Sequence, residues 1–255
     1  MTFLDSIILG IVQGLTEFLP ISSSGHLVLG QQLLHINAPG NLLEVVLHVG
    51  SLFSILVVFY KDIFSLLKSL NDPKTRLYIG AILVGTIPAV IVGLGFKDQI
   101  EHIFDSVTFV SINLCITGLL LWLTRYMQRE ENTITMKSGL MIGIAQACAI
   151  LPGISRSGST IALAMYLKIS QEEAAKFSFL LAIPALVGAG LLTALDGVND
   201  PIARAEIFPL MTGFMSSFII GWISLKWLLR VLQRGHFHWF GIYCFIIGII
   251  TLIVL

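Results

Sequence analysis

Long uninterrupted apolar stretches recur along the whole chain, and each is close to the length that crosses a lipid bilayer. A helix needs about 20 predominantly apolar residues to cross the hydrocarbon core. The pattern therefore predicts an all-α integral membrane protein with six transmembrane helices. The predicted spans are residues 42–60, 77–96, 107–125, 176–195, 207–229 and 239–255.

Two further apolar segments, residues 1–34 and 138–165, are each interrupted near the middle by proline, glycine and serine. Irregular backbone is tolerated at membrane depth only where it is buried in protein or lines a wet cavity. We therefore expect each segment to form a re-entrant helical hairpin, which enters and leaves the membrane on the same side.

The composition supports this class of protein. Of the 255 residues, 56% are apolar and 12% are charged, whereas a soluble domain carries about 25% charged residues. No basic stripe with interleaved aromatic residues is present, so we do not expect nucleic-acid binding. Cys115, Cys148 and Cys244 each stand alone in an apolar stretch, without metal-ligand spacing, and we interpret them as packing residues.

The cationic residues are distributed unevenly between the loops. Loops 97–106 and 196–206 hold only Lys97 and Arg204, against six carboxylates. Cytoplasmic loops are enriched in Lys and Arg. With six spans and two re-entrant hairpins, the basic loops all fall on one side, which predicts that both termini lie on the outer face. The basic loops hold 12 of the 15 Lys and Arg residues and are 61–76, 125–137, 168–176 and 226–238.

The chain contains an internal repeat with an offset of 133 residues. The ungapped pairing places residues 21–25 on residues 154–158, and 7 of the 17 positions from 10 to 26 are identical. The same offset places the first three spans on the last three. Because each half holds one hairpin and an odd number of spans, the halves must be inverted relative to each other. We expect a single membrane domain, 1–255, with repeat halves at about 1–130 and 134–255.

The first hairpin carries a carboxylate, hydroxyls and an imidazole. Gln13 and Glu17 are four residues apart, so they share one face of a helix. Pro20 then favours a break in the helix. A carboxylate at membrane depth is costly and marks function by default. The residues after the break are Ser22, Ser23, Ser24, Gly25 and His26.

The second hairpin offers hydroxyls, glycine turns and one guanidinium. Successive backbone N–H groups at the start of a helix bind anions, and the planar fork of Arg156 suits phosphate oxygens. Together the two hairpins hold the groups that phosphoryl transfer requires. The polar residues of this loop are Ser155, Arg156, Ser157, Gly158, Ser159 and Thr160.

Structural roles are the alternatives. Serines inside membrane helices often bond only their own backbone or a neighbouring helix, and Arg156 could pair with Glu17 as a purely structural ion pair. The two matched loops hold more serine hydroxyls than a structural ion pair between Arg156 and Glu17 would need. Glu44 and His48 share a helix face early in a span. Either they line the outer mouth of the cavity, or Glu44 caps a helix near the interface.

The stretches QGLTEFLPISSSGH and LPGISRSGST resemble the two signature motifs of the undecaprenyl-pyrophosphate phosphatase family, also called the bacitracin-resistance family. The first matches the pattern (Glu/Gln)-x-x-x-Glu with a serine-rich loop and a histidine. The second matches Pro-Gly-x-Ser-Arg-Ser-x-x-Thr. The resemblance covers essentially the whole chain, including its length and its duplicated halves.

The resemblance implies hydrolysis of undecaprenyl pyrophosphate to undecaprenyl phosphate and inorganic phosphate. This reaction recycles the lipid carrier of peptidoglycan synthesis, and with it supports cell-wall biogenesis and cell shape. It also confers resistance to bacitracin, an antibiotic that acts on the same lipid. The expected location is the bacterial cytoplasmic membrane. A homodimer is compatible with the sequence.

The expected catalytic residues are Glu17, Ser23, His26 and Arg156. The expected nucleophile is Ser23, His26 or water, and His26 is alternatively the proton donor to the leaving group. Glu17 is expected to orient or deprotonate its partner, or to hold a divalent cation such as magnesium or calcium. The family pattern allows either glutamate or glutamine at the position of Gln13. Because a glutamine carries no charge, we expect Glu17 rather than Gln13 to act as the base or as the charged ligand. The expected substrate-binding residues are Gln13, Ser22, Ser24, Gly25, Ser155, Ser157, Gly158 and Thr160.

A function from another class is movement of an anionic polyprenyl phosphate between leaflets, because inverted repeats with broken helices are typical of secondary transporters. Binding alone would need Arg156 and the hydroxyls, but it gives no role to Glu17 and His26 beside a serine. A third hypothesis, a purely structural scaffold, gives no reason for Arg156 at membrane depth.

Overall fold

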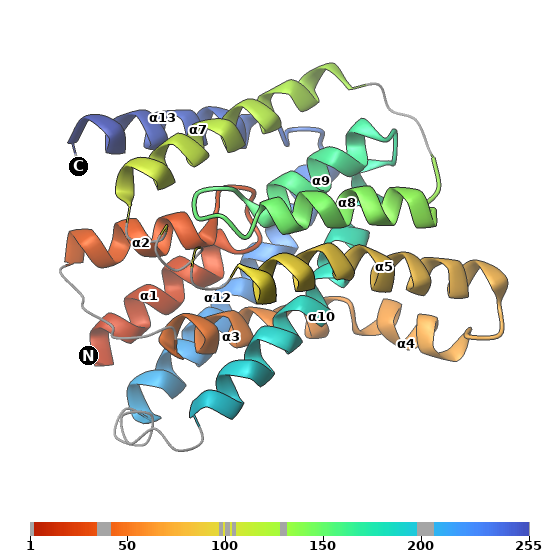
Figure 1. The fold of residues 1–255 in the computed structure, drawn as a ribbon, viewed down its shortest axis with the longest axis horizontal. Helices are drawn as coiled ribbons and strands as arrows, with labels where there is room; N and C mark the ends of the chain where they lie inside the picture. The colour runs from red at the N-terminus through yellow and green to blue at the C-terminus, as the bar shows by residue number, and fades with distance from the viewer. Residues whose placement is uncertain are drawn as a thin grey trace.

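The computed structural model of the chain describes residues 3–34, 42–96, 99, 103, 106–127, 132–197 and 207–254. Within these residues all regular secondary structure is helical, as the apolar pattern predicts (Figure 1). Three cationic residues used to predict the orientation, Lys97, Arg129 and Arg204, lie outside the described residues.

Both interrupted segments form broken helices. The first consists of α1 (Phe3–Thr16) and α2 (Ser23–Leu34), and the second of α8 (Met136–Cys148) and α9 (Arg156–Tyr166); α1 packs on α2 and α8 on α9.

The serines before α2 and α9 end the two loops in the same way. Ser22 Oγ accepts a hydrogen bond of 3.2 Å from the backbone N–H of Gly25, and Ser155 Oγ accepts one of 3.0 Å from Gly158. Each serine therefore caps the helix that follows it.

Each predicted span is found as a helix, although not all are of spanning length. Within the described part of the chain, four helices are long and apolar enough to cross a membrane, and a fifth span results if α3 and α4 (Tyr60–Lys68), which meet at 67°, are counted together. At 16 residues, α13 is shorter than these. The span helices are α3 (Leu42–Val58), α5 (Pro73–Gly95), α7 (Val107–Leu123) with the 3-10 turn η1 (Thr124–Tyr126), α10 (Gln171–Gly197), α12 (Ile207–Gln233) and α13 (Trp239–Val254).

The bend at Phe59 has a sequence cause. From Tyr60 onward the apolar run gives way to an amphipathic pattern that includes Lys61, Asp62 and Lys68, and α4 buries none of its residues. The segment 61–76, which the sequence predicts as a loop, begins with this short helix. A charged segment leaves the line of α3 because its side chains cannot remain in an apolar layer.

The hairpin of each half packs against a span of the other half. Helix α1 lies against α12 and α8 against α5, while α7 pairs with α13. Glycines permit the close approach. A Cβ on Gly10 would lie 2.6 Å from the carbonyl O of Gly213, and a Cβ on Gly143 would overlap the backbone of Gly85.

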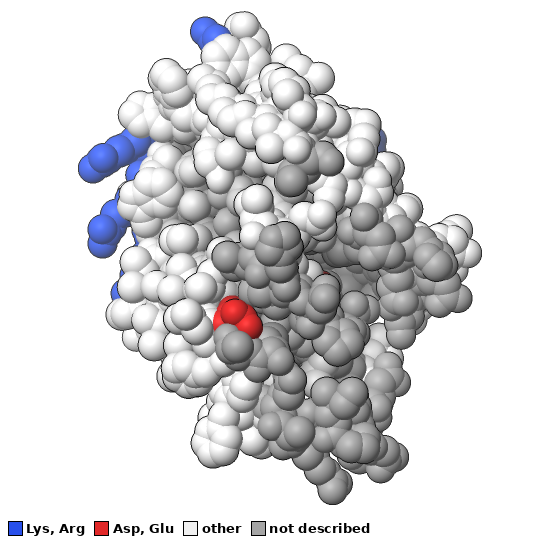
Figure 2. Space-filling view, turned by 90° about the vertical axis from the view of Figure 1, so that its left-hand side faces the viewer, with Lys and Arg blue, Asp and Glu red and all other residues white. Residues whose placement is uncertain are grey.

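The molecule has two chemically different ends. In Figure 1 the first turn of α1 and the last turn of α13 lie at one end, whereas α4, the last turn of α7 and the turn into α10 lie toward the other. Figure 2 views the end that carries the termini; among the described residues, its Lys and Arg side chains are confined to the edges of the view. The predicted basic loops therefore gather away from the termini.

Candidate active site

The loops of the two hairpins meet in the middle of the molecule. Ser157 Oγ donates to the carbonyl O of Leu19 at 3.2 Å. A Cβ on Gly25 would lie 3.2 Å from Cα of Gly153, so these two loops touch through their backbones. As a result, the N-termini of α2 and α9 are brought close to each other.

Helix α7 fixes the second loop. Asn113 Nδ2 donates to the carbonyl O of Pro152 at 2.8 Å, and Thr117 Oγ1 donates to that of Gly153 at 2.9 Å. Gly153 has φ +90°, and a Cβ there would overlap the carbonyl O of Val110. Only glycine suits this position, because it tolerates the left-handed conformation and occupies no side-chain space.

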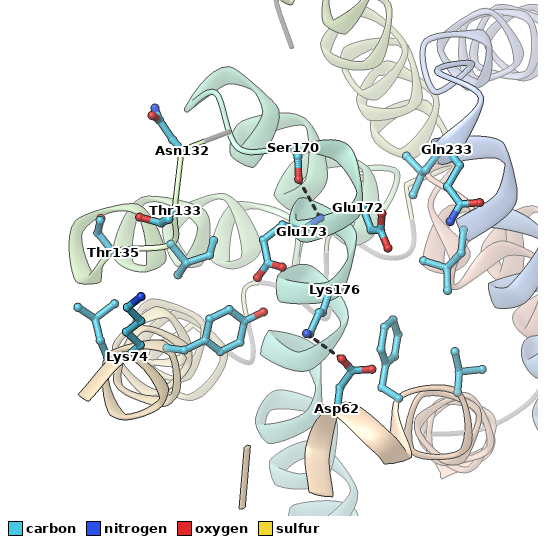
Figure 3. A pocket seen from close by; sticks show the side chains of 17 residues that line it. Asp62, Lys74, Asn132, Thr133, Thr135, Ser170, Glu172, Glu173, Lys176 and Gln233 are labelled. Atoms are coloured by element: carbon cyan, nitrogen blue, oxygen red, sulfur yellow. Dashed lines mark hydrogen bonds and ion pairs between the residues drawn. The ribbon is translucent and has the colours of Figure 1, made fainter. Parts of the chain in front are cut away.

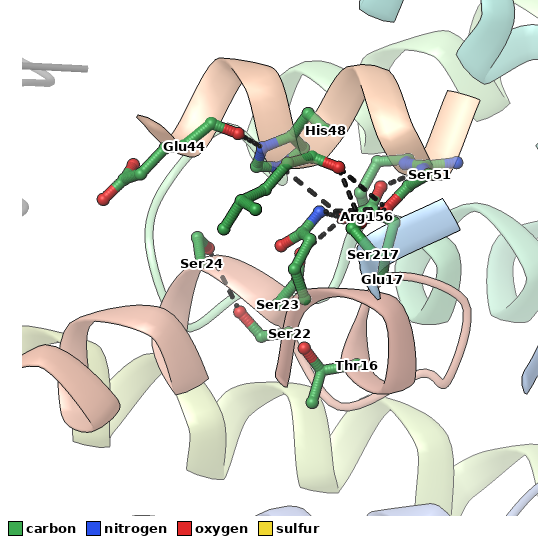
Figure 4. Close-up of polar contacts among 12 residues, drawn as sticks. Thr16, Glu17, Ser22, Ser23, Ser24, Glu44, His48, Ser51, Arg156 and Ser217 are labelled. Carbon is green, nitrogen blue, oxygen red and sulfur yellow. Dashed lines mark hydrogen bonds and ion pairs between the residues drawn. The ribbon is translucent and has the colours of Figure 1, made fainter. Parts of the chain in front are cut away.

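Glu17 is the centre of the polar cluster, directly after the end of α1 (Figure 4). Its side chain is only 5% exposed. Oε1 forms an ion pair with Nη2 of Arg156 from the other half of the chain. Oε2 accepts from Ser23 Oγ at 2.6 Å and from Gln13 Nε2 at 3.0 Å. The structure thus brings four of the predicted site residues together around one carboxylate.

Two buried polar atoms of this cluster have no hydrogen-bond partner: Nη1 of Arg156 and Oε1 of Gln13. Buried polar groups are nearly always paired, so an orphaned guanidinium donor calls for an explanation. A ligand oxygen that reaches Nη1 would provide the missing partner. Arg156 is therefore placed to bind an anion while it stays paired with Glu17.

Two serines from other helices complete the buried surroundings of Gln13. Ser51 Oγ on α3 lies 3.4 Å from Gln13 Nε2 and 3.0 Å from Ser217 Oγ on α12. Sequence reasoning missed both serines. Ser51 had a usable signal, because Glu44, His48 and Ser51 follow one face of a helix at spacings of four and three.

His48 reaches the cluster, and its Nε2 lies 3.5 Å from Oε2 of Glu17. The carboxylate of Glu44 points away from Glu17 (Figure 4) and accepts from Gln31 Nε2 of α2 at 3.3 Å. The two residues that sequence reasoning treated as a pair therefore have separate environments.

His26 lies apart from the cluster. Its Nδ1 is 2.8 Å from the carbonyl O of Ser22, and its Nε2 is 2.9 Å from the hydroxyl of Tyr243 on α13. The two rings stack with centroids 5.7 Å apart. Among the contacts of the described residues, none joins His26 to Glu17 or Arg156. Its immediate effect is on the backbone of the serine loop.

The remaining predicted residues shape the two loops. The hydroxyls of Ser22 and Ser24 lie 3.3 Å apart, and so do those of Ser155 and Ser157. Gly25 and Gly158 are buried and supply the capping N–H groups.

Thr160, which is fully buried, fixes the second loop helix to its neighbour. Its hydroxyl lies 2.5 Å from that of Ser178, and so ties α9 to α10.

The described residues hold no group of three His, Cys, Asp or Glu side chains that could bind a metal ion. Glu17, the candidate ligand, already accepts from Arg156 and Ser23 through its two oxygens. The described side chains thus form no ready-made site of three such ligands, and binding of magnesium or calcium stays a prediction.

A separate cavity of about 920 Å³ opens at the basic end of the molecule. Lys176 pairs there with Asp62 at 2.7 Å, beside Tyr78 and Glu173 (Figure 3). None of the residues of the two motifs lines this cavity. This cavity is therefore separate from the predicted active site, which lies where the hairpin loops meet.

Comparison with known proteins links this arrangement to one family. The model of the family "Bacitracin resistance protein BacA" matches residues 6–250. The chain is 41% identical to undecaprenyl-diphosphatase 1 of Bacillus cereus, over 99% of this chain and 97% of that protein. It is 42% identical to the undecaprenyl-diphosphatase of Desulfosudis oleivorans, over 98% and 97% of the two chains. It is 40% identical to the undecaprenyl-diphosphatase of Bacteroides fragilis, over 100% of this chain and 98% of that protein.

Proposed function

The chain belongs to the family of bacitracin resistance protein BacA, and we infer that it is a membrane phosphatase that hydrolyses undecaprenyl diphosphate to undecaprenyl phosphate and inorganic phosphate. The observation that carries this function is the cluster of Arg156, Glu17 and Ser23. It combines an anion-binding cation, a carboxylate and a hydroxyl within hydrogen-bonding distance. A site that only binds an anionic lipid would use Arg156 and the hydroxyl, but it has no need for a carboxylate that accepts from both.

Two features support binding of the diphosphate at this place. Nη1 of Arg156 is buried without a partner. The first turns of α2 and α9 start next to it, and the N-terminus of a helix favours anions through its N–H groups and dipole. The diphosphate would thus be held between the hairpin loops, while its apolar tail stays among the lipids.

The hydrogen bond from Ser23 to Glu17 supports Ser23 as the nucleophile. In the first step Ser23 Oγ attacks the terminal phosphorus, its proton passes to Glu17, and the bond from that phosphorus to the bridging oxygen breaks. Undecaprenyl phosphate leaves. In the second step water attacks the phosphorus of the phosphoserine, the bond from Ser23 Oγ to phosphorus breaks, the proton held by Glu17 returns to Ser23 Oγ, and inorganic phosphate leaves. Arg156 stabilises the charge on the transferring phosphoryl oxygens in both steps, and such stabilisation dominates phosphoryl transfer.

Six spans arranged as an inverted repeat remain our proposal for the architecture. Three matched features of the two halves support it. Ser22 and Ser155 cap their helices through equivalent bonds. Helix α1 packs on α12 as α8 packs on α5. Gly10 and Gly143, one repeat apart, both sit at those helix contacts.

We further propose that the protein lies in the bacterial cytoplasmic membrane with both termini on the outer face. The gathering of the basic loops at the end away from the termini supports this orientation (Figure 1). If this orientation is correct, Asp5→Cys should react with an impermeant thiol reagent added outside the cell, whereas Ser65→Cys should not. In this location the enzyme would recycle the carrier lipid for cell-wall synthesis and compete with bacitracin for that lipid.

Assembly of the protein as a homodimer stays a prediction.

The test is phosphate release from farnesyl diphosphate by the purified protein in detergent. No second compartment exists in detergent micelles, so a lipid transporter would release no phosphate. Catalytic release of inorganic phosphate supports the hydrolase. Stable binding of the diphosphate without turnover would favour the transporter instead.

A further inference from the structure

His48 on α3 contacts the catalytic cluster from outside both sequence motifs. Its Nε2 lies 3.5 Å from Oε2 of Glu17, the oxygen that also accepts from Ser23. The imidazole is 27% exposed, whereas the side chain of Glu17 is 5% exposed. His48 thus lies between the buried carboxylate and the more accessible part of the site.

The second ring nitrogen determines where the proton of His48 lies. Nδ1 is 2.7 Å from the carbonyl O of Glu44, one helical turn earlier. A carbonyl oxygen can only accept a hydrogen bond, so Nδ1 carries a proton. Nε2 then presents either a lone pair or a second N–H to Glu17. An N–H on Nε2 would be attracted to the carboxylate, which it faces at 3.5 Å.

Arg156 and His48 therefore contact opposite oxygens of the same carboxylate. Arg156 pairs with Oε1 and His48 faces Oε2. The last torsion of a glutamate side chain is broad; Gln13 Nε2 at 3.0 Å and His48 Nε2 at 3.5 Å both contact Oε2 of Glu17 and so oppose its rotation. Rotation would move Oε2 away from Ser23. A contact on each oxygen removes this freedom.

We propose that His48 is a positioning residue of the hydrolysis: it fixes Oε2 of Glu17 in the orientation that receives the hydroxyl of Ser23. The proposal rests on the function proposed above for the same site. It assigns the imidazole of the site to His48 in α3, whereas His26 of the first motif contacts Ser22 and Tyr243.

The test compares His48→Ala and His48→Gln with the wild type, using farnesyl diphosphate in detergent. His236→Ala is the matched control, because His236 is exposed in the turn between α12 and α13. We expect His48→Ala to lower kcat by about 10- to 100-fold with little change in KM, which is the scale of a misplaced catalytic group. The amide of His48→Gln can donate to Oε2, so this variant should recover most of the lost kcat.

The outcomes separate this proposal from the function on which it rests. If the wild type releases no phosphate, the proposed function fails. If the wild type is active and folded His48→Ala turns over within about twofold of it, a change too small for a misplaced group, the role of His48 is overturned. The positioning role is also overturned if His48→Gln is as slow as His48→Ala, or if His236→Ala loses as much activity. Equal elution of all variants on size exclusion establishes that they are folded.

Discussion

Ser23 donates a hydrogen bond of 2.6 Å to Oε2 of Glu17 across the break between α1 and α2. The other oxygen of the same carboxylate pairs with Arg156, which begins α9 in the second half of the chain. The site therefore exists only when both hairpins are folded against each other.

The first prediction concerns the covalent intermediate. If Ser23 is the nucleophile, substrate labelled in its terminal phosphate should leave labelled phosphoserine at position 23 after an acid quench, as determined by mass spectrometry. Ser23→Ala should form no adduct and lose at least about 100-fold in kcat, the scale of removing one group that acts in the transition state.

The exposed Ser65 of α4 provides the control. Ser65→Ala should keep the adduct and the activity of the wild type. An active Ser23→Ala, with no adduct in the wild type at times shorter than one turnover, would favour direct attack by water.

The second prediction concerns His26, which acts on the serine loop in our account. Ser22 adopts φ +68°, a conformation that is unfavourable for a residue with a side chain, and its carbonyl accepts from both N and Nδ1 of His26. His26→Ala should slow turnover because the loop loses this support. Adding Ser22→Gly should restore part of the activity, since glycine adopts positive φ without strain.

The comparison of the single and double variants distinguishes the two roles of His26. A nucleophile or proton donor that has been removed cannot be replaced by a change in the backbone of a neighbouring residue. If kcat of His26→Ala and of His26→Ala with Ser22→Gly is equally low in folded protein, His26 takes part in the chemistry directly.

The third prediction concerns packing between the halves. A Cβ on Gly143 would overlap the backbone of Gly85 on α5. Gly143→Ala should therefore lower the free energy of unfolding by about 1–3 kcal/mol, the usual cost of overpacking, and lower the Tm in detergent. Gly93→Ala on the same helix pair is the control, because its Cβ would meet only Ile150 Cδ1 at 3.9 Å. An unchanged Tm for Gly143→Ala would contradict the close contact of α5 with α8.

The fold was predictable to the extent that it follows from long apolar runs and their interruptions. The breaks after Glu17 and before Ser155 were foreseen because proline, glycine and serine gather there. The bend at Phe59 was not foreseen, because the amphipathic α4 resembles a solvated loop when only its charges are considered.

The candidate site was predictable where its residues share a motif. Spacing pointed to Gln13 and Glu17, and the two serine-rich loops and their family resemblance pointed to Ser23 and Arg156; the structure brings these four residues together. A single serine in an apolar span, such as Ser217, carries no such signal, because its role arises only from the packing of α12 against α1 and α3.

The roles of the two histidines also depend on packing that local sequence patterns do not reveal. Proximity in sequence favoured His26, but it follows Ser22 by one helical turn, so its ring reaches back to the carbonyl of that residue. His48 reaches Glu17 because α3 packs against α1, a contact that no local pattern reveals.

The most direct test of the account is kcat for phosphate release by Arg156→Ala and Arg156→Lys, measured on folded protein in detergent. We predict that Arg156→Ala loses at least about 10²- to 10³-fold, the cost of one preorganised donor to developing charge. Arg156→Lys should also be strongly impaired, because an ammonium cannot pair with Glu17 through one fixed nitrogen and present a second to the phosphoryl group. Turnover of Arg156→Ala at the wild-type rate would contradict the assignment of the active site to the meeting point of the two hairpins.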